Sequence, residues 1–288
     1  MKILTLTLCA AAAWFAINPA PAHSQVSRSS QLDFETMTWP ELKKAIHEQG
    51  KTTVLIFNGG TEQRGPQGVA GAHTFVAHAI GVAIAEQLGN AIAAPVMPFS
   101  VNRASAELPG TIGLTGPLFA ELNEQVAEQM IANGFKNVVL MGDHGGGQKE
   151  LAEIANKLDA KYSTQGIRIV YCADVYEKAG NDINKWLEAN DLPVGAHASI
   201  KDTSEMLYLE GDRPWVRKEL LAAAVGDPVR KRGEPADPNA KHAGNGIIGD
   251  ARRSTAEIGK HIVDIKVQCA VQQIHRLLDT GNAASTQE

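Results

Sequence analysis

Four short apolar segments, separated by longer stretches with helical spacing, constrain the fold of this chain most strongly. They cover residues 53–57, 91–97, 137–141 and 167–172. Continuous apolar runs of this length, without polar residues at alternate positions, are typical of strands buried on both faces of a parallel sheet.

The stretches between and after these segments predict helices that cover the sheet. In one of them, Leu118, Leu122, Val126 and Met130 recur every four residues, which is the spacing of one helix face. The predicted helices span residues 42–48, 74–88, 117–133, 148–161 and 254–278. The alternation of strand and helix predicts an α/β fold with three α/β/α layers around a mostly parallel sheet.

The composition fits one large domain and argues against nucleic-acid binding. The chain has 288 residues, of which 44% are hydrophobic, enough for one large core. Its formal net charge is -5 and 5% of its residues are aromatic, so it lacks the basic surface and stacking side chains of a nucleic-acid-binding protein. We expect a single domain over residues 25–288.

The first 24 residues have the pattern of a secretory signal peptide. Lys2 precedes an apolar stretch over residues 3–17, and cleavage after Ala22 or after Ser24 fits the small residues that follow. The apolar stretch is shorter than a usual transmembrane helix. The pattern predicts a periplasmic or secreted protein with no membrane association after cleavage; an uncleaved N-terminal anchor is the alternative.

Two cysteines, Cys172 and Cys269, remain in the predicted mature chain. An oxidising compartment would allow them to pair, although two buried thiols are the favoured interpretation. Neither lies in a CxxC motif or a Cys/His cluster, which argues against zinc bound by thiolates.

Residues 227–251 show no period and are rich in glycine, proline and charged side chains, which predicts a long surface loop. Loops of this length serve as lids or assembly contacts, or are disordered excursions. The sequence leaves these possibilities open.

Polar side chains able to bind a metal follow the predicted strands. Ligands of open α/β sheets bind outside the carboxyl ends of the strands, where the glycine-rich loops 59–73 and 142–147 begin. Imidazole and carboxylate are the usual ligands of zinc sites that keep a position open for water. The candidates are Glu62, Arg64 and His73 in the first loop, Asp143 and His144 in the second, and His197, Asp202 and Glu205 in a third region.

The candidates also have plainer interpretations. In these interpretations Glu62 and Arg64 would form an ordinary ion pair. His73 would cap the helix predicted from residue 74, and Asp143 would be a helix N-cap. The glycines at 145–147 make a tight turn into a helix, or cradle an anion with backbone N–H groups. The sequence has no G-x-S-x-G nucleophile elbow, no P-loop and no dinucleotide fingerprint.

Several motifs, in order along the chain, resemble those of the creatininase family. Residues 61–66, TEQRGP, resemble the family's T-E-Q-H-G-P, and Gly71-Ala72-His73 stands where that motif continues to G-T-D. Residues 108–112, LPGTI, match F-P-G-T-I. Residues 142–147, GDHGGG, match N-G-H-G-G-N, and residues 197–204, HASIKDTS, resemble H-A-G-E-x-E-T-S in the first two and last three positions.

The resemblance covers roughly residues 38–209 and implies a creatininase-like α/β fold and a homo-oligomer. Family members are mostly metal-dependent hydrolases of amide C–N bonds, with two divalent ions bridged by an aspartate. The resemblance places Glu62, His73 and His144 at the ligands of one ion. At the second ion, Arg64 replaces a histidine and Asp202 remains as a carboxylate.

These replacements imply one zinc or manganese ion instead of two. A permanently charged guanidinium at Arg64 repels a second cation, and the bridging aspartate is replaced by His73. The ion would lower the pKa of bound water, and Arg64 would take over the charge-stabilising role of the missing ion. Asp202 or His197 would orient the water or transfer protons.

The resulting hypothesis is a metal-dependent amidohydrolase that acts on the C–N bond of a linear or cyclic amide in a small molecule. The alternative is an exported small-molecule-binding protein of the same fold, which has lost the metal and clamps an anionic ligand with Arg64. A third interpretation, suggested only by residues 227–251, is an assembly component without a site.

Overall fold

The computed structural model describes residues 31–102, 107–230 and 242–284. The predicted signal peptide, residues 1–24, lies outside these ranges. Within them, no helix is both long and apolar enough to span a membrane.

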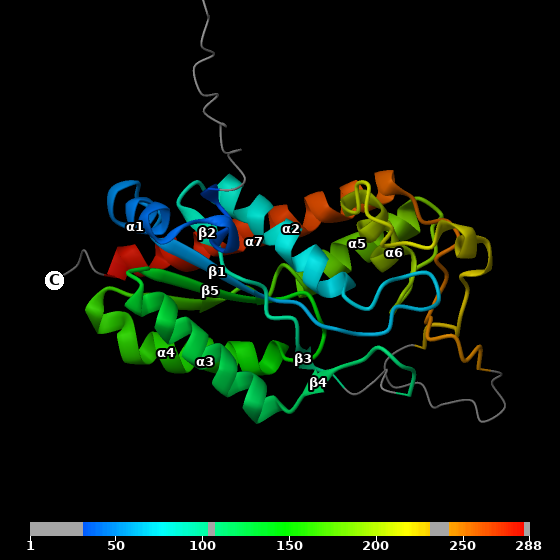
Figure 1. Ribbon diagram of the computed structural model, residues 1–288, viewed down its shortest axis with the longest axis horizontal. Helices are drawn as coiled ribbons and strands as arrows, with labels where there is room; N and C mark the ends of the chain where they lie inside the picture. The colour runs from blue at the N-terminus through cyan, green and yellow to red at the C-terminus, as the bar shows by residue number, and fades with distance from the viewer. Residues whose placement is uncertain (1–30, 103–106, 231–241, 285–288) are drawn as a thin grey trace, which may run out of the picture.

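Four parallel strands form the central sheet (Figure 1), in the order β2-β1-β5-β6. Their bounds are β1 Thr53–Asn58, β2 Ala91–Ala93, β5 Asn137–Gly142 and β6 Arg168–Tyr171. All four predicted strands are therefore present. The second is shorter than predicted, because Pro95 has no N–H to donate to a neighbouring strand; Met97 rejoins β1 as an isolated bridge to Asn58.

Helices cover both faces of the sheet, as the α/β prediction requires (Figure 1). On one face lie α2 (Ala72–Leu88) and α7 (Ala256–Ala284), and on the other α3 (Gly116–Ala132) and α4 (Gln148–Tyr162). Successive strand residues alternate between the two faces. Leu55, Phe57, Val139 and Met141 pack with α2 and α7, whereas Val54, Ile56, Val138 and Leu140 pack with α3 and α4.

Three further helices lie within the described residues, two of them near the carboxyl ends of the strands (Figure 1). They are α1 (Trp39–Glu48), α5 (Glu177–Ala189) and α6 (Ile200–Leu209). A second, two-stranded sheet pairs β3 (Ser100–Val101) with β4 (Gly113–Leu114), and 3-10 turns occur at Phe34–Thr36, Ser163–Gln165 and Lys218–Ala223. Cys172 and Cys269 are buried free thiols, in agreement with the favoured interpretation.

Candidate metal centre

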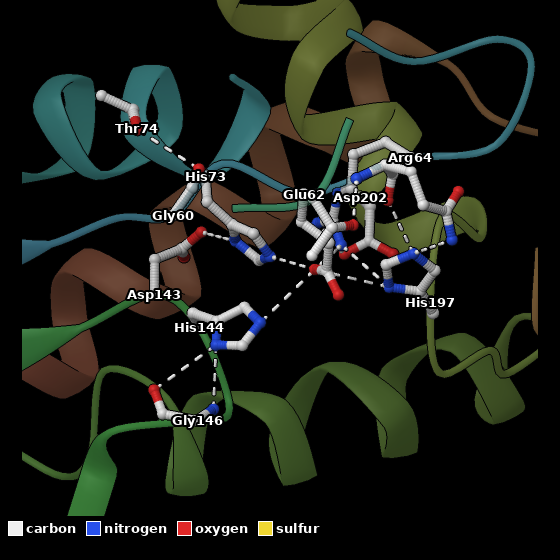
Figure 2. Close-up of polar contacts among 12 residues, drawn as sticks. Gly60, Glu62, Arg64, His73, Thr74, Asp143, His144, Gly146, His197 and Asp202 are labelled. Atoms are coloured by element: carbon white, nitrogen blue, oxygen red, sulfur yellow. Dashed lines mark hydrogen bonds and ion pairs between the residues drawn. The ribbon is translucent and has the colours of Figure 1, made fainter. Parts of the chain in front are cut away.

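The three predicted metal ligands lie together at one edge of the sheet (Figure 2). Strands β1 and β5 are parallel neighbours, so the loops that follow them meet, one carrying Glu62 and the other His144. His73 lies in the first turn of α2. The Oε2 atom of Glu62 lies 3.3 Å from Nε2 of His73 and 3.4 Å from Nε2 of His144. The assignment of these residues as ligands stays a prediction.

Their spacing fits a small divalent ion. Around a tetrahedral ion with ligand bonds of roughly 2.0–2.1 Å, neighbouring ligand atoms lie about 3.3–3.4 Å apart. The rings of His73 and His144 stand nearly perpendicular, at 85°, with their centroids 5.1 Å apart. Two imidazole nitrogens and one carboxylate oxygen leave a fourth position open, so the donor set present in this chain fits the group that the motifs imply.

The loop that carries His144 depends on its glycines. A Cβ atom at Gly146 would overlap the carbonyl oxygen of Val101, and Gly147, with φ of 96°, is the N-cap of α4. The tight-turn interpretation of the glycines is therefore correct. The N–H of Gly146 donates to Nδ1 of His144 at 2.9 Å, and the carbonyl oxygen of Gly146 lies 3.4 Å from the same Nδ1. With Nδ1 as acceptor, the proton of a neutral His144 ring is on Nε2, which faces Glu62, and an ion bound through Nε2 would have to displace that proton.

Arg64 is buried beside these ligands, with 5% of its surface exposed. Its Nη2 lies 2.9 Å from Oδ1 of Asp202, whereas its Nη1 lies 3.6 Å from Oε2 of Glu62. Its main partner is thus Asp202, and the interpretation of Arg64 as an ordinary partner of Glu62 is incomplete. Burial opposes the charge, but Asp202 and Glu62 raise the pKa of Arg64 further and keep it charged.

His197 supports Arg64 from the other side. Its Nε2 lies 2.8 Å from the carbonyl oxygen of Gln63, to which it donates, so Nδ1 is free to accept from Nη1 of Arg64 at 3.3 Å. Burial and the Arg64 charge lower the pKa of His197. Because His197 and Asp202 are both engaged with Arg64, the geometry favours a positioning role for them. Their predicted part in proton transfer stays a prediction.

The family-like motifs contact one another around the site. Thr61 forms an isolated antiparallel β-bridge with Ile112, and the N–H of Gln63 donates to Oγ1 of Thr111. The described end of the loop predicted over 227–251 also packs here, since Ile248 bridges to His197. Residues 231–241 of that loop lie outside the described ranges.

Two plainer interpretations are wrong. Helix α2 begins at Ala72 after Gly71, so His73 is not its cap, and α4 begins five residues after Asp143. The side chain of Asp143 instead accepts from Nδ1 of His73 at 2.7 Å and from Nζ of Lys266 at 2.9 Å. Burial opposes ionisation of Asp143, but Lys266 and His73 lower its pKa.

Lys266 is the site residue that sequence reasoning missed. It lies on α7 between Ile262 and Ala270, both fully buried, so it continues the same i, i+4 stripe on the helix. A lysine inside an apolar stripe was the available signal. Its Nζ lies 2.5 Å from Oε1 of Glu205, which the sequence did mark as a candidate.

A cavity of about 750 Å³ opens onto the site. Its lining includes Glu62, Arg64, His73, His144, His197 and Lys266, and a wall from the α5 region that contains Tyr176, Asn181 and Asn184. Burial, Asp143 and Asp202 raise the pKa of Tyr176, which therefore remains a neutral hydrogen-bonding group. The volume is in the range of small-molecule sites.

The buried carboxylates predict acid sensitivity of the metal-free protein. Burial opposes their ionisation, but the hydrogen bonds of Glu62 with His144 and His73, Lys266 beside Asp143, and Arg64 beside Asp202 hold all three pKa values below normal. The unfolded chain then binds more protons, so the free energy of unfolding should decrease as the pH falls below about 4, by about 1.4 kcal/mol per pH unit for each proton.

Glu205, whose pKa burial raises, acts in a different pH range: it adds stability as the pH falls toward about 4.5 and has no further effect below that. Urea midpoints of chelator-treated protein between pH 7 and pH 3 measure the effect. The variant Asp202→Asn should show a shallower decrease, and a midpoint that does not change over this range would contradict the prediction.

Comparisons with known proteins identify the family and the fold of this chain. The family model for creatininase, creatinine amidohydrolase, matches residues 35–274. The mycofactocin precursor peptide peptidase of Mycolicibacterium smegmatis is 25% identical over 244 residues, covering 81% of this chain and 88% of that protein.

Solved creatininases share the fold. The crystal structure of creatinine amidohydrolase superposes with a TM-score of 0.69 at 20% identity, covering 85% of this chain and 97% of that one. A variant creatininase of the Zn-Zn type and a manganese creatininase each give a TM-score of 0.68 at 19% identity, covering 85% of this chain and 97% and 98% of theirs. With the family model matching most of its length, the chain belongs to the creatininase family, a family of metal-dependent amidohydrolases.

Proposed function

We propose that this protein hydrolyses the C–N bond of an amide in a small molecule, with one zinc or manganese ion held by Glu62, His73 and His144. The observation that carries the proposal is that two imidazole Nε2 atoms lie 3.3 and 3.4 Å from the same carboxylate oxygen. Relatives named for zinc, for manganese and for action on a precursor peptide support an amide substrate and a divalent ion.

When bound, the ion supplies a Lewis acid and a water of lowered pKa. The residues of this chain supply the rest. Arg64 has five N–H donors, of which Asp202 and His197 each take one. The remaining donors on the guanidinium can stabilise negative charge that develops on the carbonyl oxygen of the amide.

Asp202 and His197 keep Arg64 in place at the position where the family has its second-ion histidine. Arg64 therefore substitutes for the second ion, and the site needs one metal only. We also propose export to the periplasm or beyond, on the N-terminal pattern alone, and a homo-oligomer, on the family resemblance alone.

The test is metal content and amide hydrolysis of the mature chain. We expect about one zinc or manganese per chain, lost in His144→Ala and retained in His275→Ala, a control for an exposed histidine on α7. Hydrolysis of creatinine, short peptides or other amides should stop with chelator and return with added zinc. Two ions per chain would contradict the one-metal site.

The binding-protein alternative makes a different prediction. It is favoured by the buried donors of Arg64, whose Nε has no hydrogen-bond partner within the described residues. A protein that takes up no offered metal, but binds small carboxylates in the parent form and not as Arg64→Met, would replace the hydrolase proposal.

A further inference from the structure

His73 is held from behind by a buried carboxylate. Figure 2 shows its ring between Asp143 and Glu62, with Nδ1 2.7 Å from Oδ2 of Asp143 and Nε2 3.3 Å from Oε2 of Glu62. An ionised carboxylate can only accept hydrogen bonds, so the short contact places a proton on Nδ1. With Nδ1 turned to Asp143, Nε2 faces Glu62 and is the atom whose lone pair the proposed ion would take.

Asp143 is itself held by Lys266, which also contacts Glu205 on another helix. Nζ of Lys266, on α7, lies 2.9 Å from Oδ1 of Asp143 and 2.5 Å from Oε1 of Glu205, on α6. The exposed fractions of the three side chains are 4% for Asp143, 13% for Lys266 and 4% for Glu205. Because an isolated buried carboxylate is costly, the ammonium of Lys266 stabilises the ionised form of Asp143 that His73 requires.

Two departures from the family motifs meet in this contact. His73 stands where G-T-D has its aspartate, and Asp143 stands where N-G-H has its glycine. In the structure their side chains are hydrogen-bonded. The family's bridging carboxylate is thus replaced by the imidazole of His73, and the carboxylate of Asp143 lies behind that imidazole, on the side away from the proposed ion.

We propose that Asp143, Lys266 and Glu205 form a positioning network that fixes the tautomer and orientation of His73 as a metal ligand. The inference rests on the metal site of the proposed function. A carboxylate behind a ligating histidine fixes the ring and increases its basicity, and loss of such an outer partner typically lowers metal affinity about 10- to 100-fold.

The first test is the zinc dissociation constant, measured by competition with a chromophoric chelator. We expect Asp143→Asn to weaken binding about 10- to 100-fold and Lys266→Met to weaken it about 10-fold. The control is Lys260→Met, which removes an exposed lysine of α7 that pairs with the exposed Asp264. It should bind zinc like the parent chain.

A double-mutant cycle separates positioning from general damage to the fold. If the network acts through His73, Asp143→Asn should have little further effect, less than about threefold, in a His73→Ala background. An unchanged effect in that background would overturn the inference. Activity is not needed for this measurement.

A second measurement avoids network variants, which leave buried charges unpaired and can fail to fold. Nitrogen-15 NMR of the zinc-loaded parent, assigned with His73→Ala, should show Nδ1 protonated and Nε2 bound to the ion. An unprotonated Nδ1 would overturn the inference. If the parent binds no zinc, the metal site itself is wrong; if it binds zinc and Asp143→Asn binds equally well, only the positioning network is wrong.

Discussion

Replacement of Glu62 by glutamine should abolish metal binding and also destabilise the metal-free protein. The carboxylate of Glu62 is the shared partner of His73, His144 and Arg64. Its loss removes one ligand and also the negative charge that these groups face. We expect zinc affinity to fall by more than the roughly 100-fold that loss of an outer partner causes, and the free energy of unfolding to fall by about 3 kcal/mol.

Equilibrium dialysis and urea denaturation measure the two effects separately. The matched control is Glu153→Gln, since Glu153 is exposed and pairs with Lys149 on the surface of α4. It should leave zinc binding unchanged and stability within about 0.5 kcal/mol. A Glu62→Gln protein that still holds one ion tightly would show that the ligand set is wrong.

Replacement of Arg64 by methionine should reduce kcat about 10²- to 10³-fold while one ion remains bound. This is the usual cost of removing one preorganised donor for developing charge. Because methionine keeps much of the side-chain volume without its charge, the loss reports the guanidinium. Arg64→Lys, which keeps the charge but cannot reach Asp202 and His197 as a fork, should give an intermediate kcat.

Metal analysis must accompany these kinetics. Arg64→Met leaves the carboxylate of Asp202 without its 2.9 Å partner, and a second cation could enter beside it. Arg276→Met, on the exposed end of α7, is the control for loss of an arginine. Full activity of Arg64→Met with a single ion bound would contradict the proposed role of Arg64.

The fold could be predicted because a strand that is buried on both faces of a sheet needs apolar side chains at consecutive positions, and such runs are visible in the sequence. Residues 54–57 and 138–141 are apolar throughout, and each range lies in a strand with helices on both sides. The convergence of Glu62 and His144 follows from the same pattern, since the loops after adjacent parallel strands meet at one edge.

The partners within the site were less predictable. Arg64 and Asp202 are separated by 138 residues, and Asp143 and Lys266 by 123. Their contacts depend on how α6 and α7 pack, which local spacing does not determine. Local rules offer Asp143 and His73 as helix caps, the plainer alternatives, and in both cases a distant partner engages the side chain instead.

The dual position of α7 couples local unfolding of the C-terminal helix to the whole protein. Its residues Val263, Val267 and Ala270 cover the apolar face of the sheet, while the ammonium of Lys266 between them lies against both Asp143 and Glu205. Detachment of this helix would expose that face and at the same time remove the ammonium that contacts these two buried side chains. Amide hydrogens in the middle of α7 should therefore exchange only when the entire protein unfolds, although a C-terminal helix would ordinarily be expected to fray.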